Sequence, residues 1–348
     1  MQHRTEADQQ RVFTILSIAI SAALGGFLFG YDTAVINGAV SSIEATFQIS
    51  ASVLGFTVSS ALLGSAAGAI GAGWLADRIG RRPSMLLAAV LFLLSSVGSA
   101  LAPNLMDLVV WRVLGGVAVG FASVLAPAYI AEISPASMRG RTGSLQQLAI
   151  VLGIFLSLLF NYLIVLATPD QDPMSQLGPM AAWRWMLMAE MVPALLYGFL
   201  VLRIPESPRY LVRIGDLDQA RTVISRTIGE SPETVIDRIQ TSQGEGGGGS
   251  IRELFSRRSG LLPIVWTGVL LAIFQQLVGI NVIFYYSSDL WQSVGFSTTD
   301  SLSVSVITAV TNVVTTFLAI ATIDRLGRRP LLLLGSVVMT ISLGLMSS

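Results

Sequence analysis

The sequence predicts an all-α integral membrane protein, on three observations. Hydrophobic residues make up 53% of the 348 residues and charged residues only 12%, whereas soluble domains carry roughly 25% charged residues. The mean hydropathy is +0.70. Nine apolar runs have about the length that a helix needs to cross a bilayer, roughly 17–25 residues. The chain is therefore expected to lie in a membrane.

The predicted spans follow one another with short loops, except for one long polar stretch after the sixth. Their approximate ranges are 11–39, 53–75, 84–102, 106–130, 143–166, 183–202, 261–286, 302–323 and 331–348. The N-terminal residues are polar and lack the apolar core of a signal peptide. We divide the chain into an N-terminal six-helix bundle (1–204), a cytoplasmic helical linker (205–260) and a partial C-terminal bundle (261–348).

Composition excludes several kinds of site. Cysteine is absent and His3 is the one histidine, so disulfides, thiolate metal sites and histidine-based catalysis are not expected. The formal net charge is zero, which gives no indication of a nucleic-acid partner. No nucleophile–base pair or metal cluster is visible. We predict that the protein is not an enzyme and binds no metal.

Arginine placement predicts the orientation. All 21 basic residues are arginines, and if nine spans alternate, only Arg112 and Arg184 fall outside the tail and loops of one side. The positive-inside rule places that side in the cytoplasm. The sequence therefore predicts a multi-pass protein of the cell (inner) membrane with a cytoplasmic N-terminus.

Asp32 is an acidic residue inside the first apolar run, in Gly30-Tyr-Asp-Thr-Ala-Val35. An ionisable group there costs roughly 2.5–3.5 kcal/mol on insertion scales, so its default interpretation is functional, with a named partner. Arg112 is the predicted partner, because a rise of about 1.5 Å per residue places both in the outer half of the membrane. We expect a proton on Asp32 to release Arg112. The alternatives are a permanent structural ion pair and a helix cap near the interface.

Two loops of the chain are nearly identical. Asp77-Arg-Ile-Gly-Arg-Arg-Pro83 follows the second span and Asp324-Arg-Leu-Gly-Arg-Arg-Pro330 follows the eighth. Their glycines, Gly80 and Gly327, permit a tight reversal. The repetition predicts a duplicated six-helix unit, which is the architecture of major facilitator transporters.

Further segments carry a specific family resemblance. They are Trp111-Arg-Val-Leu-Gly-Gly116, Ala131-Glu-Ile-Ser-Pro135, Pro205-Glu-Ser-Pro-Arg-Tyr-Leu211 and Gln275-Gln-Leu-Val-Gly-Ile-Asn-Val-Ile-Phe-Tyr-Tyr286. With the Asp32 segment and both loops, they make the sequence resemble the sugar porter family of the major facilitator superfamily, especially its bacterial proton-coupled pentose and hexose symporters. The resemblance implies the major facilitator fold with nine of its twelve transmembrane helices present, alternating access, and proton coupling through Asp32 and Arg112.

Amide and aromatic side chains are the predicted sugar ligands, because amides both donate to and accept from hydroxyls. Gln275, Gln276 and Asn281 lie in the seventh span, where Gln276 and Asn281 would point about 140° apart on an ideal helix. Gly279 between them is expected to let the helix unwind. The alternative for each amide is an interhelical hydrogen bond. The remaining candidates are Phe29, Gln147 and Asn312, which match family positions that line the cavity, and Tyr285 and Tyr286.

Charged residues at the cytoplasmic ends of the spans form a predicted gate. Glu132 and Arg139 bracket the end of the fourth span, and Glu206 and Arg209 bracket the end of the sixth; the resemblance implies that such residues form networks that close the inner side. One surface ion pair is worth roughly 0–1 kcal/mol, but a network can bias a two-state equilibrium. The gate candidates are Asp77, Arg78, Arg81, Glu132, Arg139, Arg141, Glu206, Arg209, Asp324, Arg325 and Arg328.

The predicted function is proton-coupled symport of a monosaccharide by alternating access. The proton gradient is the expected driving force, with no cofactor, and the lipid bilayer and the sugar are the expected partners of a chain that is a monomer when complete. Because the ninth span runs to the last residue, we expect a C-terminally truncated sequence. The alternatives are a facilitative sugar uniporter, a non-transporting sugar sensor and an inactive truncated relic.

Overall fold

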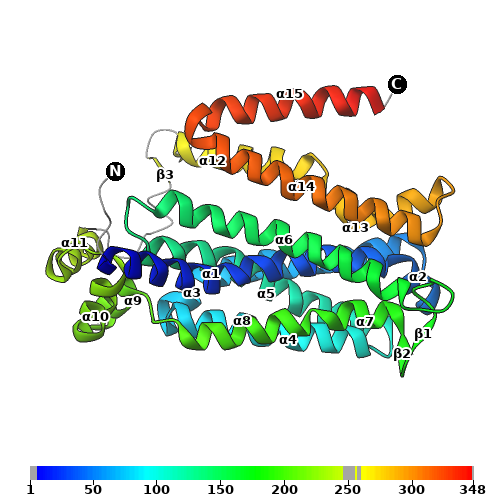
Figure 1. Ribbon diagram of the computed structural model, residues 1–348, viewed down its shortest axis with the longest axis horizontal. Coiled ribbons are helices and arrows are strands. Elements are labelled where there is room, and N and C mark those ends of the chain that lie inside the picture. The colour runs from blue at the N-terminus through cyan, green and yellow to red at the C-terminus, as the bar shows by residue number, and fades with distance from the viewer. Residues whose placement is uncertain (1–5, 246–254, 257–259, 347–348) are drawn as a thin grey trace.

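The computed structural model describes residues 6–245, 255–256 and 260–346 and consists almost entirely of helices (Figure 1). The helices are α1 (Glu6–Val35), the 3-10 helix η1 (Ile36–Gly38), α2 (Val40–Phe47), α3 (Ala51–Ile79), α4 (Arg81–Leu101), α5 (Leu105–Ile133), α6 (Arg139–Leu166), α7 (Ala182–Ala189), α8 (Met191–Arg203), α9 (Pro208–Ile214), α10 (Leu217–Thr227), α11 (Pro232–Glu245), α12 (Pro263–Leu277), α13 (Ile280–Ser293), α14 (Thr298–Leu326) and α15 (Arg328–Met346). Two antiparallel strand pairs, β1 (Gln176–Leu177) with β2 (Met180–Ala181) and β3 (Phe255–Ser256) with β4 (Gly260–Leu261), complete the elements.

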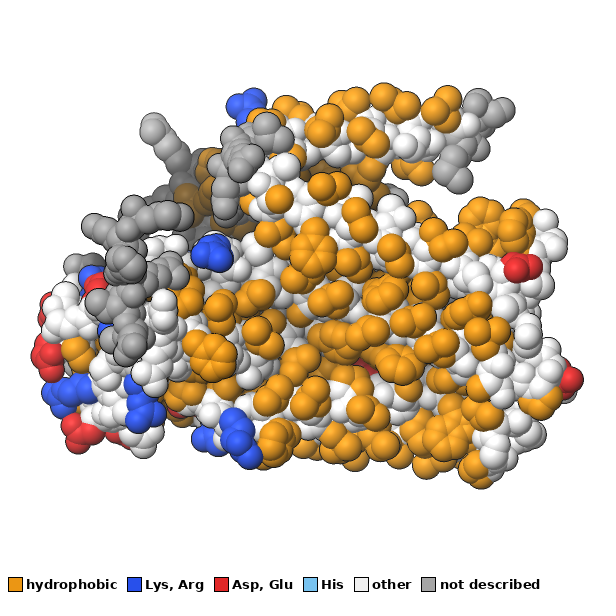
Figure 2. All heavy atoms as spheres, in the orientation of Figure 1, with side chains coloured by type: hydrophobic (Ala, Val, Ile, Leu, Met, Phe, Trp, Pro, Cys, Tyr) orange, Lys and Arg blue, Asp and Glu red, His pale blue; other side chains and the backbone are white. Residues whose placement is uncertain are grey.

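The spans predicted from hydropathy form helices, apart from a few residues at their ends and two internal breaks. Eight segments of the described chain are long and apolar enough to cross a membrane, and Arg329–Leu345 is a shorter apolar helix. Apolar side chains cover the middle of the face seen in Figure 2, and charged side chains gather toward the end that carries α9–α11. These features confirm the all-α membrane fold. The long spans extend beyond their predicted ends, because polar residues at the ends of the apolar runs continue the helices.

Two predicted spans are broken. The sixth divides at Glu190 into α7 and α8, because the ring of Pro193 lacks an N–H and clashes with the carbonyl of the residue four positions earlier. The seventh divides into α12 and α13 at Gly279, which has a φ of 78°. This left-handed conformation is accessible to glycine at little cost. The break at Gly279 was predicted, and the break at Glu190 was not.

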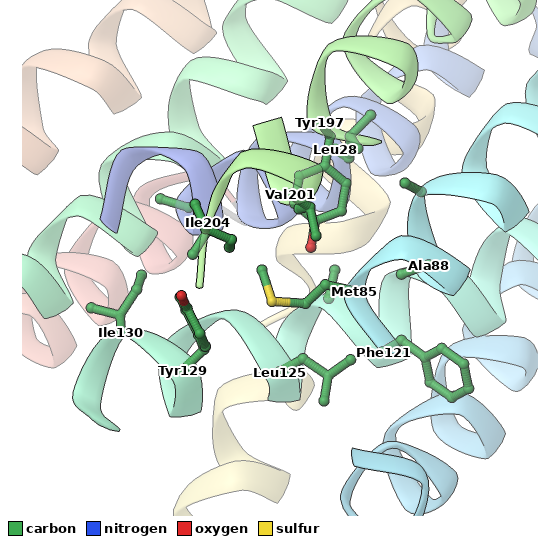
Figure 3. Packing of buried hydrophobic residues seen from close by; sticks show 14 of the residues in the cluster. Leu28, Met85, Ala88, Phe121, Leu125, Tyr129, Ile130, Tyr197, Val201 and Ile204 are labelled. Carbon is green, nitrogen blue, oxygen red and sulfur yellow. The ribbon is translucent and has the colours of Figure 1, made fainter. Parts of the chain in front are cut away.

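Spans α1 to α8 pack into one bundle around a continuous apolar core. In Figure 3, Met85 of α4 lies between Val201 of α8 and Leu125 of α5, and all three side chains are buried. The cluster also takes in Tyr129 and Tyr197 and uses residues from α1, α3, α4, α5 and α8, with Ile204. No residue of α12–α15 belongs to this main cluster.

Close packing of α3 on α5 depends on small residues. A Cβ added to Gly64 would lie 2.1 Å from the carbonyl oxygen of Val113, and one added to Gly68 would lie 2.4 Å from that of Val117. Backbones approach this closely only where side chains are absent. Gly64, Gly68 and Ala72, spaced four residues apart on α3, are all buried, and the two glycines form a packing surface for α5.

Gly64→Ala is expected to destabilise the protein. The helices would have to separate, at a cost of about 1–3 kcal/mol, which exceeds the ~1 kcal/mol that alanine gains over glycine in a helix. The measurement is the midpoint of thermal unfolding in detergent. Gly73→Ala on the same helix is the matched control, since an added Cβ there meets nothing within 4 Å. A Gly64→Ala protein as stable as the Gly73→Ala protein would contradict this account.

The remaining helices attach at the two ends of the bundle. At one end, α9, α10 and α11 share a small apolar cluster that includes Leu211, Ile224 and Ile236. Helix α9 begins at the N-cap Ser207, whose Oγ accepts from the backbone N–H of Arg209, and ends at Gly215, which has the left-handed conformation. At the other end α13 and α14 contact α2, η1 and α6. Helix α2, which the sequence did not predict, lies at this second end.

Candidate functional site

The predicted ion pair between Asp32 and Arg112 is present in the bundle interior. Arg112 Nη1 donates to Asp32 Oδ1 at 3.1 Å, and the two residues are 2% and 3% exposed. Arg112 Nε and Nη2 are buried and have no hydrogen-bond partner among the described residues. A guanidinium that leaves two donors unpaired in a buried site retains the capacity to bind a second acceptor.

Glu190 is a second acidic residue at this site, and the sequence analysis missed it. Its side chain is 2% exposed, its Oε1 has no partner among the described residues, and it lies within electrostatic range of Asp32 and Arg112. The break between α7 and α8 places it there. An ionisable residue inside the apolar run 183–202 was the signal that would have identified it.

A cavity of about 380 Å³ adjoins Asp32 between the first bundle and the broken seventh span. Five predicted site residues line it: Phe29, Asp32, Gln276, Asn281 and Tyr285. Small residues of α3, Ser65 among them, form another part of the wall. The Nδ2 of Asn281 donates to the Oε1 of Gln276 at 3.2 Å. On an unbroken helix these two amides would diverge, so the turn at Gly279 brings them together.

Four other predicted sugar ligands do not line this cavity. Gln147 and Gln275 are exposed, and Asn312 is partly exposed on α14. Tyr286 packs beside the apolar cluster at the α2 end of the bundle. The neighbouring Gln146 is buried instead of Gln147, and its Oε1 has no partner among the described residues.

Polar contacts close the α2 end of the cavity, and we call them the Asn37 seal. Asn37 Nδ2 donates to the carbonyl oxygen of Phe284 and to Ser287 Oγ, both at 2.9 Å, and Ser288 Oγ donates to the carbonyl oxygen of Asn37 at 2.7 Å. Ser287 Oγ and Ser305 Oγ are 2.7 Å apart. All these groups are buried, so the seal joins η1 to α13 and α14 with water excluded. This seal was not predicted from the sequence.

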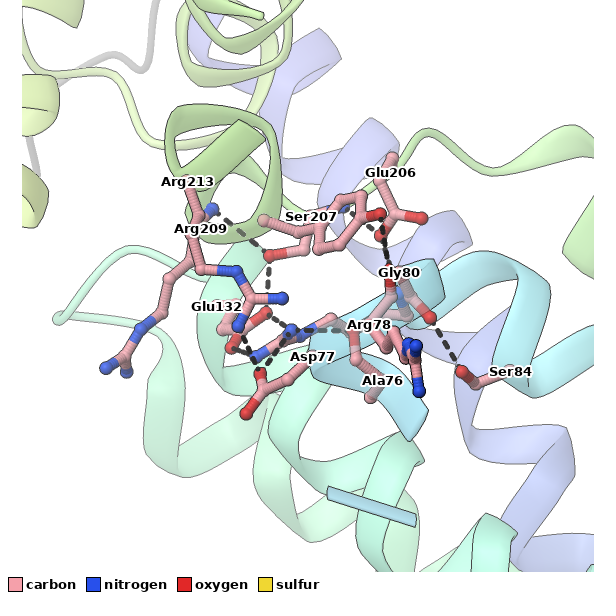
Figure 4. Close-up of polar contacts among 12 residues, drawn as sticks. Ala76, Asp77, Arg78, Gly80, Ser84, Glu132, Glu206, Ser207, Arg209 and Arg213 are labelled. Carbon is pink, nitrogen blue, oxygen red and sulfur yellow. Dashed lines mark hydrogen bonds and ion pairs between the residues drawn. The ribbon is translucent and has the colours of Figure 1, made fainter. Parts of the chain in front are cut away.

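At the opposite end, Arg81 is the centre of the predicted gate. Its Nε and Nη2 donate to the two carboxylate oxygens of Glu132 at 3.1 Å each, and its Nη1 lies 3.0 Å from Asp77 Oδ1. Asp77 also pairs with Arg213 of α9 at 3.0 Å, and Ser207 donates to Glu132. Figure 4 shows the side chains of Asp77, Glu132 and Ser207 close together, joined by these contacts. Asp77 and Glu132 therefore both have partners within the first 213 residues.

Glu206, which was predicted to bracket the end of the sixth span together with Arg209, forms a helix cap. Glu206 accepts from the backbone N–H groups of Arg81, Arg82 and Ser207 at 3.0, 3.1 and 2.8 Å. The first amides of α4 have no partner within the helix and attract a carboxylate. Burial nonetheless raises the pKa of Glu206 above its ordinary value, and these amide hydrogen bonds oppose that rise.

The other gate candidates are less involved. Arg139 and Arg141 are exposed, whereas Glu132 pairs with Arg81. Arg139 and Arg209 line a cavity of about 330 Å³ beside Glu132. Arg78 lies over the ring of Trp74 at 5.2 Å. The side chains of Asp324, Arg325 and Arg328 lie outside the part of the structure that is described.

Glu132→Gln is expected to lower the free energy of unfolding by about 1.5–3 kcal/mol, the usual worth of hydrogen bonds to charged groups. The two Arg81–Glu132 contacts are shielded, with side chains 13% and 12% exposed. Thermal unfolding in detergent measures the change. Asp218→Asn is the control, because it breaks the exposed Arg221–Asp218 pair, whose aspartate is 96% exposed. Equal losses from both variants would show that shielding is unimportant.

The two ends of the molecule are unequal. The α2 end is closed by the Asn37 seal, whereas at the α9–α11 end a cavity of about 500 Å³ separates α6 from α14, lined by Arg141, Ser144 and Phe317 among others. A helical bundle with buried charges, a central cavity and one closed end defines a membrane transporter of the major facilitator class, which is a carrier and not an enzyme.

Comparison with known proteins identifies the family. The family model for "Sugar (and other) transporter" matches residues 18–347. The chain is 55% identical over 333 residues to a glucose transport protein of Synechocystis sp., covering 96% of this chain and 71% of that protein. It is 38% identical over 356 residues to the D-xylose-proton symporter of Escherichia coli K12, covering 94% and 71%. The chain belongs to the sugar transporter family.

A solved structure agrees with this assignment. The xylose transporter XylE from E. coli, in a partially occluded inward open conformation, matches with a TM-score of 0.78 and 37% sequence identity over 91% of this chain and 75% of that one. The predicted resemblance to the sugar porters is thereby confirmed. The chain spans about 71% of the length of the curated relatives named above.

Proposed function

We propose that this protein couples the movement of a monosaccharide to that of a proton. The observation that supports this proposal best is the charge balance beside the cavity: Asp32 pairs with Arg112, and a second buried carboxyl, Glu190, lies within electrostatic range of both. With both carboxyls ionised the buried site would carry one excess negative charge, and an uncompensated charge in a dry interior is costly. A bound proton removes that excess.

The proton and the sugar would interact through Asp32, which both pairs with Arg112 and lines the central cavity. A cavity of about 380 Å³ suits a small ligand. Gln276 and Asn281 offer donors and acceptors for hydroxyl groups, and Phe29 and Tyr285 offer aromatic surface. Relatives of the chain are named as transporters of glucose, xylose, galactose and arabinose, so we propose a pentose or hexose as substrate.

Transport would proceed by alternating access between the Asn37 seal and the network around Arg81. We place the α9–α11 end and the N-terminus in the cytoplasm and the protein in the cell membrane, on the arginine distribution. Residues 1–204 and 261–348 would act as the two moving bodies, with 205–260 as linker. The proton gradient is the proposed driving force, without a cofactor, and the proposed unit is a monomer.

The test is sugar-dependent proton movement in sealed vesicles that contain the purified full chain and an internal pH indicator. Adding the transported sugar outside is expected to acidify the interior, since sugar and proton enter together, while the enantiomer of that sugar gives no signal. A panel of D-glucose, D-xylose, D-galactose and L-arabinose identifies the substrate. Sugar uptake without acidification would replace the proposal with a uniporter, and sugar binding without uptake would replace it with a sensor.

A further inference from the structure

A separate cavity of about 450 Å³ lies outside the candidate site, between helix α10 and the nearby ends of the transmembrane helices α1, α4 and α8. Residues from α1, α4, α8 and α10 contribute to its wall, and these helices come together at that end of the molecule in Figure 1. Three arginines line it, Arg82, Arg203 and Arg226, along with hydroxyl side chains such as Thr14 and Thr222. None of the described lining residues is acidic.

No ion pair among the described residues offsets the positive charge of this cavity. Arg82 donates from Nε and Nη2 to the carbonyl oxygens of Val201 and Leu202, at 3.3 and 2.7 Å, so neutral groups hold it in place. Arg203 lies over the ring of Phe199 at 4.6 Å. Among the described residues none of the three guanidiniums forms an ion pair. The nearby Glu206 accepts from the backbone N–H of Arg82. Three guanidiniums without carboxylates favour a phosphate, which arginine binds through parallel hydrogen bonds.

The cavity also lies at the edge of the apolar surface that faces lipid. Leu202, which lines it, is 55% exposed, and Phe199 one turn earlier on α8 is 52% exposed. Both belong to a segment long and apolar enough to cross the membrane. A ligand in this position would therefore have its charged part among the arginines and open apolar surface directly beside it.

We propose that this cavity binds the phosphate headgroup of an anionic phospholipid, with its acyl chains along Phe199 and Leu202. Basic residues at a membrane boundary attract such lipids. Because Arg226 belongs to α10 and Arg82 to α4, one headgroup connects the helical linker to the first bundle. The backbone of Arg82 is itself held by Glu206, so the lipid lies next to the network around Arg81.

The test is titration of the purified full chain in neutral detergent with phosphatidylglycerol and with phosphatidylcholine, followed by native mass spectrometry. The wild type is expected to bind phosphatidylglycerol more tightly. Arg226→Gln, an exposed change on α10, is expected to weaken that binding roughly fivefold, and the Arg203→Gln/Arg226→Gln double variant by roughly 25-fold. Only variants that keep the wild-type unfolding midpoint are compared. Because Arg226 is exposed, Arg226→Gln is expected to fold as the wild type does, so at least this variant can be compared.

The matched control is the Arg78→Gln/Arg221→Gln double variant. It removes the same number of charges as the double variant in the cavity. Arg78, like Arg203, lies over an aromatic ring at a helix end, and Arg221, like Arg226, belongs to α10, but neither Arg78 nor Arg221 lines the cavity. It is expected to bind phosphatidylglycerol as the wild type does. Equal weakening in both double variants, or equal binding of phosphatidylcholine, would overturn the proposal. Glycerol 3-phosphate binding as tightly as the lipid would also overturn it and identify a soluble phosphate ester as the ligand.

Discussion

Asp32→Asn is expected to abolish uphill, proton-driven sugar accumulation while sparing sugar exchange. Asparagine keeps the shape of the side chain beside Arg112 and in the cavity wall but cannot exchange a proton. With one proton per sugar, a gradient of one pH unit supports an about tenfold accumulation, and the variant is expected to reach only equal concentrations on both sides. The measurement is labelled sugar uptake into vesicles with an imposed pH gradient, next to exchange of labelled sugar at uniform pH.

Asp170→Asn is the matched control for that experiment. It makes the same chemical change in an exposed loop, where Ser175 Oγ donates to the carboxylate at 3.3 Å, and it is expected to accumulate sugar as the wild type does. Persistent uphill accumulation in Asp32→Asn would refute the role of Asp32 in coupling. Loss of exchange as well as accumulation would indicate that Asp32 serves sugar binding or structure.

Asn37→Ala is expected to open the α2 end of the cavity. The change removes both hydrogen bonds from Nδ2 to α13 and leaves the Phe284 carbonyl and Ser287 without that partner. Each such bond contributes about 0.5–1.5 kcal/mol, so the closed state would lose about 1–3 kcal/mol, a roughly 5- to 150-fold shift in the ratio of the two states.

The absence of cysteine makes this shift measurable. A single Ser65→Cys places a thiol in the wall of the central cavity, and a membrane-impermeant maleimide added at the α2 side reports on access. Labelling is expected to be faster when Asn37→Ala is present. Ser293→Ala, which removes a hydroxyl bonded within α13 to Leu290, serves as control. An unchanged labelling rate with Asn37→Ala would mean that other contacts hold this end closed.

Some of the architecture was predictable because it depends on local sequence. Span positions follow from apolar length, and the break at Gly279 follows from glycine between two amides on divergent faces. The pairing of Asp32 with Arg112 was predictable from their similar depth, since each needs a partner in the bilayer. Glu190 was equally accessible to that reasoning, and it was missed because the sixth apolar run was treated only as a span.

Other features depend on contacts that the sequence does not encode locally. Asn37 and Ser287 are 250 positions apart, and their hydrogen bond exists only because η1 meets α13. Glu206 was predicted only as a gate residue at the end of the sixth span, yet it caps α4 because that helix begins beside it. The pairing of Glu132 with Arg81 has the same origin, since the packing of α4 on α5 brings the two together.

The self-contained core of the first bundle has a consequence for biosynthesis. The last residue of its main apolar cluster in the sequence is Ile204. Two polar contacts of the segment that follows also lie within the first 213 residues: Arg213 pairs with Asp77, and Tyr129 donates to the carbonyl oxygen of Pro205 at 2.7 Å. At a ribosomal rate of about 5–20 residues per second, α12 emerges several seconds after α8. Helices α1 to α8 can therefore pack in the membrane first. Helices α13 and α14 then pack against α1, α2 and α6, which are already in place, as they are inserted.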